Sequence, residues 1–150
     1  MSAYSFLDIV GSIVGPGGLI SIGNGTGSAK EGIEIKWKED KNKQTIGADG
    51  TAMNVLSADD SAEVSVKLLR TSTWNALLQI MYNYQKSTAL LWGKNHSVFT
   101  DMARGDFVTL ADMAFKKCPG WDAKEAPDVV EWTFDVGKAH VIRGIGTPEI

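Results

Sequence analysis

Residues 62–86, AEVSVKLLRTSTWNALLQIMYNYQK, carry the pattern that decides the fold. The first part alternates apolar with polar side chains, a period of two that is typical of a strand with one buried face. Its apolar positions are Ala62, Val64, Val66 and Leu68. The second part changes to the spacing of one helix face, and Thr-Ser-Thr before it offers an N-cap. Its apolar positions are Trp74, Leu77, Leu78 and Met81. The stretch therefore predicts a strand over 62–68 and one amphipathic helix at about 73–86.

Further strands are predicted on both sides of this stretch. They span residues 4–14, 19–22, 33–37, 96–103, 107–116 and 130–136. Alternation of apolar and polar side chains is clearest at 33–37 and 130–136. The turn Arg-Gly-Asp between two of the other segments favours a hairpin. Many strands with one helix predict a mainly β fold, an antiparallel β-sandwich or barrel flanked by that helix.

The composition favours one domain over residues 1–150. The length of 150 residues suffices for one core, and a net charge of −3 disfavours nucleic-acid binding through bulk charge. The single cysteine, Cys118, excludes an intrachain disulfide and favours a reducing compartment. The apolar N-terminal stretch is interrupted by Asp8 and is too short to span a bilayer, so we expect no membrane binding by this subunit.

The glycine-rich stretch IGNGTGSAKEG at 22–32 does not match a phosphate-binding loop. Such a loop has a lysine directly after its last glycine and a helix behind it. Here Lys30 follows an alanine and precedes Glu31 and a predicted strand. We interpret the stretch as a surface loop.

No other pattern predicts catalysis or a bound group. His96 and His140 lie far apart in the sequence and lack the spacing of a zinc site. Cys118 lies between two lysines and a proline, without the signature of a nucleophile. Adjacent Asp59 and Asp60 would point to opposite faces of a strand and make a poor acid/base pair. We therefore expect no catalytic residue, no metal site and no cofactor.

The five tryptophans divide between core and loops. Trp37, Trp74 and Trp132 occupy positions that should face the core. Trp92 and Trp121 lie near loops, where exposed aromatic side chains can anchor a protein interface.

Three segments are expected to project from the domain. Residues 23–32 are rich in glycine, residues 39–60 are charged and contain the turn Gly-Ala-Asp-Gly, and residues 141–150 contain two glycines and a proline. We predict that these segments act as arms.

The order of these parts resembles the tail tube proteins of tailed bacteriophages, in particular a group from contractile-tailed phages. The matching runs are IGADGTAMNVLSADDSAEVSVKLLRTSTWNALLQIMYN, RGDFVTLADMAFKKCP and VVEWTFDVGK, and the likeness covers residues 4–140. The resemblance implies a fold shared with the tubes of contractile injection systems and a structural role without enzymatic activity. It also implies homohexameric rings that stack into a hollow tube, with DNA passing through the lumen. The implied partners are the sheath, baseplate and tail terminator proteins, and the implied place is the virion tail, assembled in the host bacterial cytoplasm.

Stacking and DNA passage point to two sets of candidate residues. The arm at 39–60 supplies candidate inter-ring contacts, which are Lys41, Lys43, Asp49, Asp59 and Asp60. A channel that passes DNA quickly must not hold it, since each phosphate bound by lysine or arginine adds salt-dependent affinity. The solvated strand faces supply candidate lumen-facing acids, which are Glu63, Glu131 and Asp135.

Two alternatives stay open at this point. The chain could form the tube of a phage-like bacteriocin or secretion system, with the same fold and a different cargo. It could also be a small β-sandwich enzyme or ligand-binding module that uses Cys118, His96 or the tryptophans. Neighbouring genes distinguish the first alternative from a phage tail, because capsid and terminase genes indicate a phage. Loss of an activity after thiol-reactive labelling would favour the second alternative.

Overall fold

The computed structural model describes residues 9–23, 28–70, 73–101, 103–121 and 129–144. The elements are β1 (Ile9–Gly15), β2 (Gly18–Gly23), β3 (Ser28–Trp37), β4 (Asn42–Ile46), β5 (Ala52–Leu56), β6 (Ala62–Leu69), α1 (Trp74–Gln85), β7 (Asn95–Asp101), β8 (Asp106–Lys117) and β9 (Val129–Ile142). Seven strands form one antiparallel sheet in the order β2-β1-β7-β8-β9-β6-β3, and β4 and β5 form a separate two-stranded sheet.

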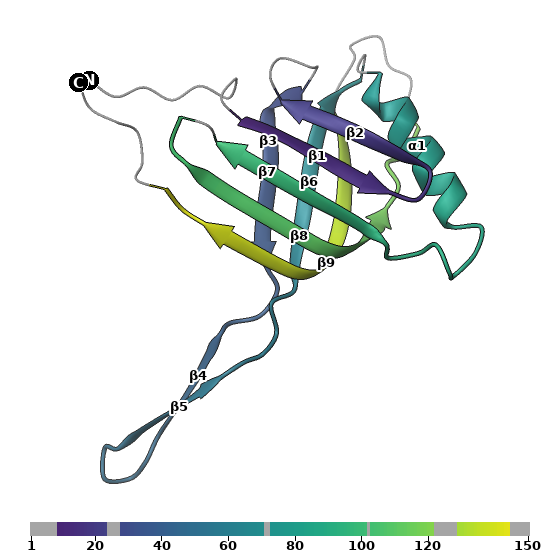
Figure 1. Ribbon diagram of the computed structural model, residues 1–150. Helices are drawn as coiled ribbons and strands as arrows, with labels where there is room; N and C mark the ends of the chain where they lie inside the picture. The colour runs from purple at the N-terminus through teal and green to yellow at the C-terminus, as the bar shows by residue number, and fades with distance from the viewer. Residues whose placement is uncertain (1–8, 24–27, 71–72, 102, 122–128, 145–150) are drawn as a thin grey trace.

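The large sheet bends over itself into two layers. Figure 1 shows β2, β1, β7 and β8 in front and β3 and β6 behind, with the long strands β8 and β9 running through both layers. At the bend Asp112 adopts a φ of 54°, and a Cβ on the facing Gly137 would lie 2.9 Å from Asp112 Cβ. The register of β7 against β8 also shifts there, as expected for a β-bulge. The result is a sandwich-like fold with open edges at β2 and β3, which confirms the predicted mainly β, antiparallel class.

The core lies between the layers and under the helix. Alternation along β6 is complete, since Ala62, Val64, Val66 and Leu68 are all fully buried. Phe115 on β8 is the centre of an aromatic cluster. Its ring centroid lies 5.6, 5.9 and 4.7 Å from those of Tyr82, Trp132 and Phe134, respectively. Such ring pairs add stability beyond the area that they bury.

The helix α1 packs beside β2 and buries Leu78, Met81 and Gln85. Thr73 of the predicted Thr-Ser-Thr cap occupies the N-cap position, but it has helical dihedral angles and makes no side-chain cap hydrogen bond. An N-cap side chain reaches the first turn from an extended backbone, which Thr73 does not have. Thr71 and Ser72 lie outside the described residues.

Several predicted boundaries differ from the structure. β3 begins at Ser28, so residues 28–32 of the first predicted arm belong to a strand that pairs with β6. β9 continues to Ile142, so it takes the first two residues of the predicted C-terminal arm. Residues 24–27 and 145–150 lie outside the described residues.

Trp37 is a further correction, because it is 50% exposed although its register partner Ala62 is fully buried. The residue ends β3, where the chain leaves the sheet for the hairpin, so no second layer covers its ring. Trp132 is buried and Trp74 packs against the core, as predicted.

Candidate interaction surfaces

The hairpin β4–β5 projects from one end of the domain and has both faces in solvent (Figure 1). We call residues 38–41 and 57–61, which connect the hairpin to β3 and β6, the neck. Here Ser57 N donates to Lys41 O at 2.8 Å, and Ala139 N donates to Asp60 O at 3.0 Å, which joins the neck to β9. Four large apolar side chains on the hairpin are exposed by 47% to 82%. They are Ile46, Met53, Val55 and Leu56. A two-stranded hairpin is marginally stable alone, so this exposed apolar surface points to a partner.

Four of the five candidate inter-ring residues have local roles in the hairpin and its neck. Lys41 forms an ion pair with Asp60 across the neck. Asp59 accepts a hydrogen bond from Ser61 N at 2.8 Å. Asp49 accepts one from Thr51 N at 3.0 Å at the tip. These hydrogen bonds stabilise the charged carboxylates.

The same hydrogen bonds change the acidity of the two turn carboxylates. The side-chain and backbone hydrogen bonds of Thr51 hold the pKa of Asp49 below its ordinary value. Those of Ser61 lower the pKa of Asp59 in the same way, helped by the charges of Lys41 and Lys38. Both carboxylates therefore remain charged to lower pH than free aspartate.

The candidate lumen-facing acids lie on one face of the sheet, opposite the core. Glu63 on β6 and Asp135 on β9 are directly opposite each other in the register. Two like charges at such a position repel. Lys116 Nζ reaches Glu63 Oε2 at 2.7 Å, and Lys38 Nζ reaches Asp135 Oδ1 at 2.7 Å. We call these four side chains the ion-pair quartet.

The quartet also changes the acidity of one of its lysines. The hydrogen bond and the charge interaction between Lys116 and Glu63 raise the pKa of Lys116 above its ordinary value, so its ammonium group stays charged. Glu131, the third candidate acid, lies opposite Lys67 on the same face. The alternation of the sequence thus places all three acids on one surface, together with lysines that the sequence analysis did not assign to it.

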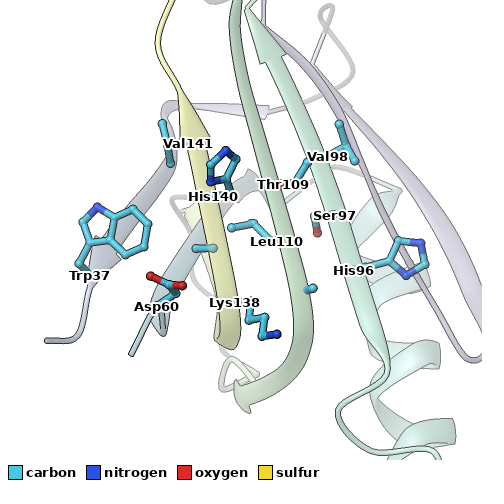
Figure 2. Close-up of a pocket in the computed structure, with 12 residues that line it drawn as sticks. Trp37, Asp60, His96, Ser97, Val98, Thr109, Leu110, Lys138, His140 and Val141 are labelled. Atoms are coloured by element: carbon cyan, nitrogen blue, oxygen red, sulfur yellow. The ribbon is translucent and has the colours of Figure 1, made fainter. Parts of the chain in front are cut away.

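A groove of about 520 Å³ lies at the root of the hairpin (Figure 2). Trp37 and Asp60 line one side, and Lys138, His140 and His96 extend across the outer surface of β9, β8 and β7. The two histidines lie on different strands with β8 between them. Within the described ranges no three His, Cys, Asp or Glu side chains gather where they could hold a metal ion.

The other chemically suggestive residues have structural partners. Cys118 is half-buried, and its Sγ lies 3.3 Å from Gln79 Oε1 on α1. Arg104 of the Arg-Gly-Asp turn is buried and donates to Asp101 Oδ2 at 2.9 Å, so it is not presented to an external ligand. None of the helices that the structure describes has the length and apolarity needed to cross a membrane.

The outer side of α1 is a second exposed apolar surface, with Leu77, Ile80 and Tyr84 exposed by 36%, 56% and 51%. Leu77 is a correction, because the sequence analysis placed it on the packed face of the helix, and Ile80 and Tyr84 escaped that analysis. Trp121, which the sequence analysis placed near a loop, is 87% exposed, and the guanidinium carbon of Arg70 lies 5.8 Å from its ring centroid. The spacing of Leu77, Ile80 and Tyr84 on a second helix face was the available signal.

The family model described as "Bacteriophage PhiTE tail tube protein" matches residues 1–144. No curated protein matches the sequence.

Three solved structures with this fold come from contractile particles. The cap of the anti-feeding prophage, which terminates its tube, is 9% identical with a TM-score of 0.59, covering 96% of this chain and 93% of that one. The sheath-tube complex of the extracellular contractile injection system PVC contains a chain that is 11% identical with a TM-score of 0.58, covering 94% and 92%. A chain of the PVC sheath/tube terminator is 12% identical with a TM-score of 0.54, covering 95% and 98%. At these identities the likeness concerns the fold alone.

Proposed function

Because the chain belongs to the bacteriophage PhiTE tail tube protein family, and is thus a structural rather than an enzymatic protein, we propose that it forms homohexameric rings that stack into a hollow tube. The tube conducts genomic DNA inside a contractile sheath. Sheath, baseplate and tail terminator proteins are its partners, and it assembles in the host bacterial cytoplasm as part of the virion tail. The structural neighbours come from sheath-tube, terminator and baseplate assemblies, which supports these partners.

The observation that carries the proposal is the hairpin β4–β5. It extends away from the sheet and exposes apolar side chains on both faces, including Met53 and Val55 on one and Leu56 on the other. A surface of this kind is stable when another subunit covers it. Head-to-tail contact through a projecting segment generates an open stack of rings, and the free edges β2 and β3 offer backbone groups for contacts within a ring.

We further propose that the face with Glu63, Glu131 and Asp135 lines the lumen. This face belongs to β6 and β9, and β6 continues directly from the hairpin neck. Its side chains are charged and solvated, which suits a water-filled channel. Lys41, Lys43, Asp49, Asp59 and Asp60 lie on or beside the hairpin and remain the proposed inter-ring contacts.

Electron microscopy of the purified protein tests the proposal. We expect hollow tubes with sixfold end views at high concentration or after addition of baseplate proteins. Removing residues 42–56 and joining Lys41 to Ser57 through a short Asn-Gly turn preserves the neck, since the two residues are already hydrogen bonded. This variant should remain folded and form no tubes.

Point variants give a matched comparison on an intact hairpin. Met53→Ser/Val55→Ser removes two exposed apolar side chains and should prevent stacking. Gln44→Ser/Asn54→Ser removes two exposed polar side chains from the other face and should permit it. Normal tubes from the shortened hairpin would refute the assignment of stacking to this element.

The tube of a phage-like bacteriocin or secretion particle is the second candidate, because the structural neighbours are parts of contractile injection particles. Isolated particles that contain a capsid and DNA support the phage assignment. Capsid-free particles that are complete and contract support the alternative.

A further inference from the structure

We propose that Glu63 and Asp135 act as counter-charges that prevent Lys38 and Lys116 from binding the phosphates of double-stranded DNA. This inference rests on the proposed function, in which DNA passes this face. It concerns how a surface rich in lysine avoids holding a polyanion.

The geometry of the quartet supports this role. The two acids are directly opposite each other, and each lysine reaches across an intervening strand, Lys38 from the residue after β3 to β9 and Lys116 from β8 to β6. The quartet therefore pairs two positive with two negative charges in one compact group. Its side chains are 34% to 48% exposed, so the lysines would be open to solvent and to phosphate without the acids.

The surroundings explain why neutralisation matters. The same face carries other exposed or half-exposed lysines, which are Lys36, Lys67 and Lys117. Glu34 lies 3.3 Å from Lys36 and Glu131 lies opposite Lys67, so without Glu63 and Asp135 these two acids would face five lysines on this surface. Such an excess of lysine on one face is the electrostatic signature of nucleic-acid binding. Exposed ion pairs contribute little to folding stability, so stability alone gives weak reason for two like charges placed opposite each other.

The test measures retention of the purified full-length protein on immobilised double-stranded DNA at a series of NaCl concentrations. Glu63→Gln/Asp135→Asn removes both counter-charges and keeps the side-chain shapes. The wild type should elute unretained. The variant should be retained, with a slope of log affinity against log salt of about −1.8, which is 0.9 for each of two phosphate contacts. Its affinity should fall about tenfold between 50 and 200 mM salt.

Two control variants identify the lysines as the cause. Glu39→Gln/Asp40→Asn changes two exposed acids of the hairpin neck and gives the same net charge, so it should elute with the wild type. Adding Lys38→Gln and Lys116→Gln to the first variant should abolish its retention. Circular dichroism checks that each protein is folded.

Three results would overturn the inference. They are retention of the wild type, elution of Glu63→Gln/Asp135→Asn with the wild type, and equal retention of the neck control. The column reports on free subunits, so its outcome does not depend on assembly. Microscopy of the same variants reports tube formation separately, which distinguishes failure of this inference from failure of the proposed function.

Discussion

A buried pair of amides determines where α1 meets the sheet, and removing it should be costly. Gln85 in the last turn of α1 and Asn95 at the start of β7 are 0% and 1% exposed. Each amide nitrogen donates to the oxygen of the other, at 2.7 and 2.8 Å. Gln85 Nε2 also donates to Pro16 O in the β1–β2 turn, at 2.9 Å. The pair therefore joins three elements at one point.

The substitution Gln85→Met keeps the length of the side chain and removes all three hydrogen bonds. It leaves both the nitrogen and the oxygen of the buried Asn95 amide without Gln85, and each such group costs about 1–3 kcal/mol, whereas the half-buried Pro16 carbonyl can turn to water. We expect the free energy of unfolding to fall by roughly 3–5 kcal/mol, out of the 5–15 kcal/mol that is typical of a domain. The protein should remain folded but lose much of its stability.

Urea denaturation followed by tryptophan fluorescence measures the loss, and a double-mutant cycle identifies its source. Asn95→Leu alone should be similarly destabilising, whereas the double variant leaves no unpaired amide. The two effects should therefore be less than additive, with a coupling of about 1–3 kcal/mol. Asn83→Met on the exposed side of α1 is the control, expected within about 0.5 kcal/mol of wild type. An unchanged midpoint for Gln85→Met, or additive effects, would refute the reasoning.

Three further predictions concern the ends and turns of the sheet. Asp101→Ala leaves the buried Arg104 without its carboxylate and should cost about 3–5 kcal/mol in urea denaturation, and a wild-type midpoint would contradict this. Gly144→Ala places a Cβ in collision with Arg104 O, so the backbone at Gly144 should shift and the variant should be more sensitive to limited proteolysis than the wild type. Asp49 and Asp59 have lowered pKa values in the folded chain, so their stabilisation of the hairpin is present above the unfolded pKa and is lost as pH falls through the folded one. Carboxyl NMR titrations should give midpoints below those of the unfolded chain, and equal midpoints would exclude this linkage.

The parts of the fold with strong periodicity could be predicted from the sequence. β6 and the first half of β9 alternate without interruption, and α1 follows a helical spacing. The end of β9 could not be predicted, because Gly137 and Lys138 break the alternation at the bend where the strand changes layers. Pairing with β8 continues the strand beyond this point, and such pairing depends on residues distant in the sequence.

The candidate surfaces were partly predictable for the same reason. Alternation was enough to place Glu63 and Asp135 on the solvated face. Their position directly opposite each other follows from the register of β6 against β9, which one strand does not reveal. The ion pair between Glu63 and Lys116 depends both on that register and on the register shift near the end of β8, so the sequence could not predict it. In the hairpin, the sequence predicted contacts through charged residues and did not predict the exposed Met53, because its exposure depends on the hairpin standing apart from the sheet.

The local roles of the hairpin charges determine which of them can report on contacts between rings. Asp59 and Asp60 stabilise the neck, so their removal would disturb the hairpin before any partner arrives. Lys43 is different, because it is exposed on β4 opposite Val55 and makes no hydrogen bond or ion pair with the part of the chain that the structure describes. We therefore expect Lys43→Glu to leave the urea midpoint unchanged and to reduce tube formation in negative stain, whereas Lys43→Arg should assemble normally. Normal tubes from Lys43→Glu would remove this residue from the proposed interface.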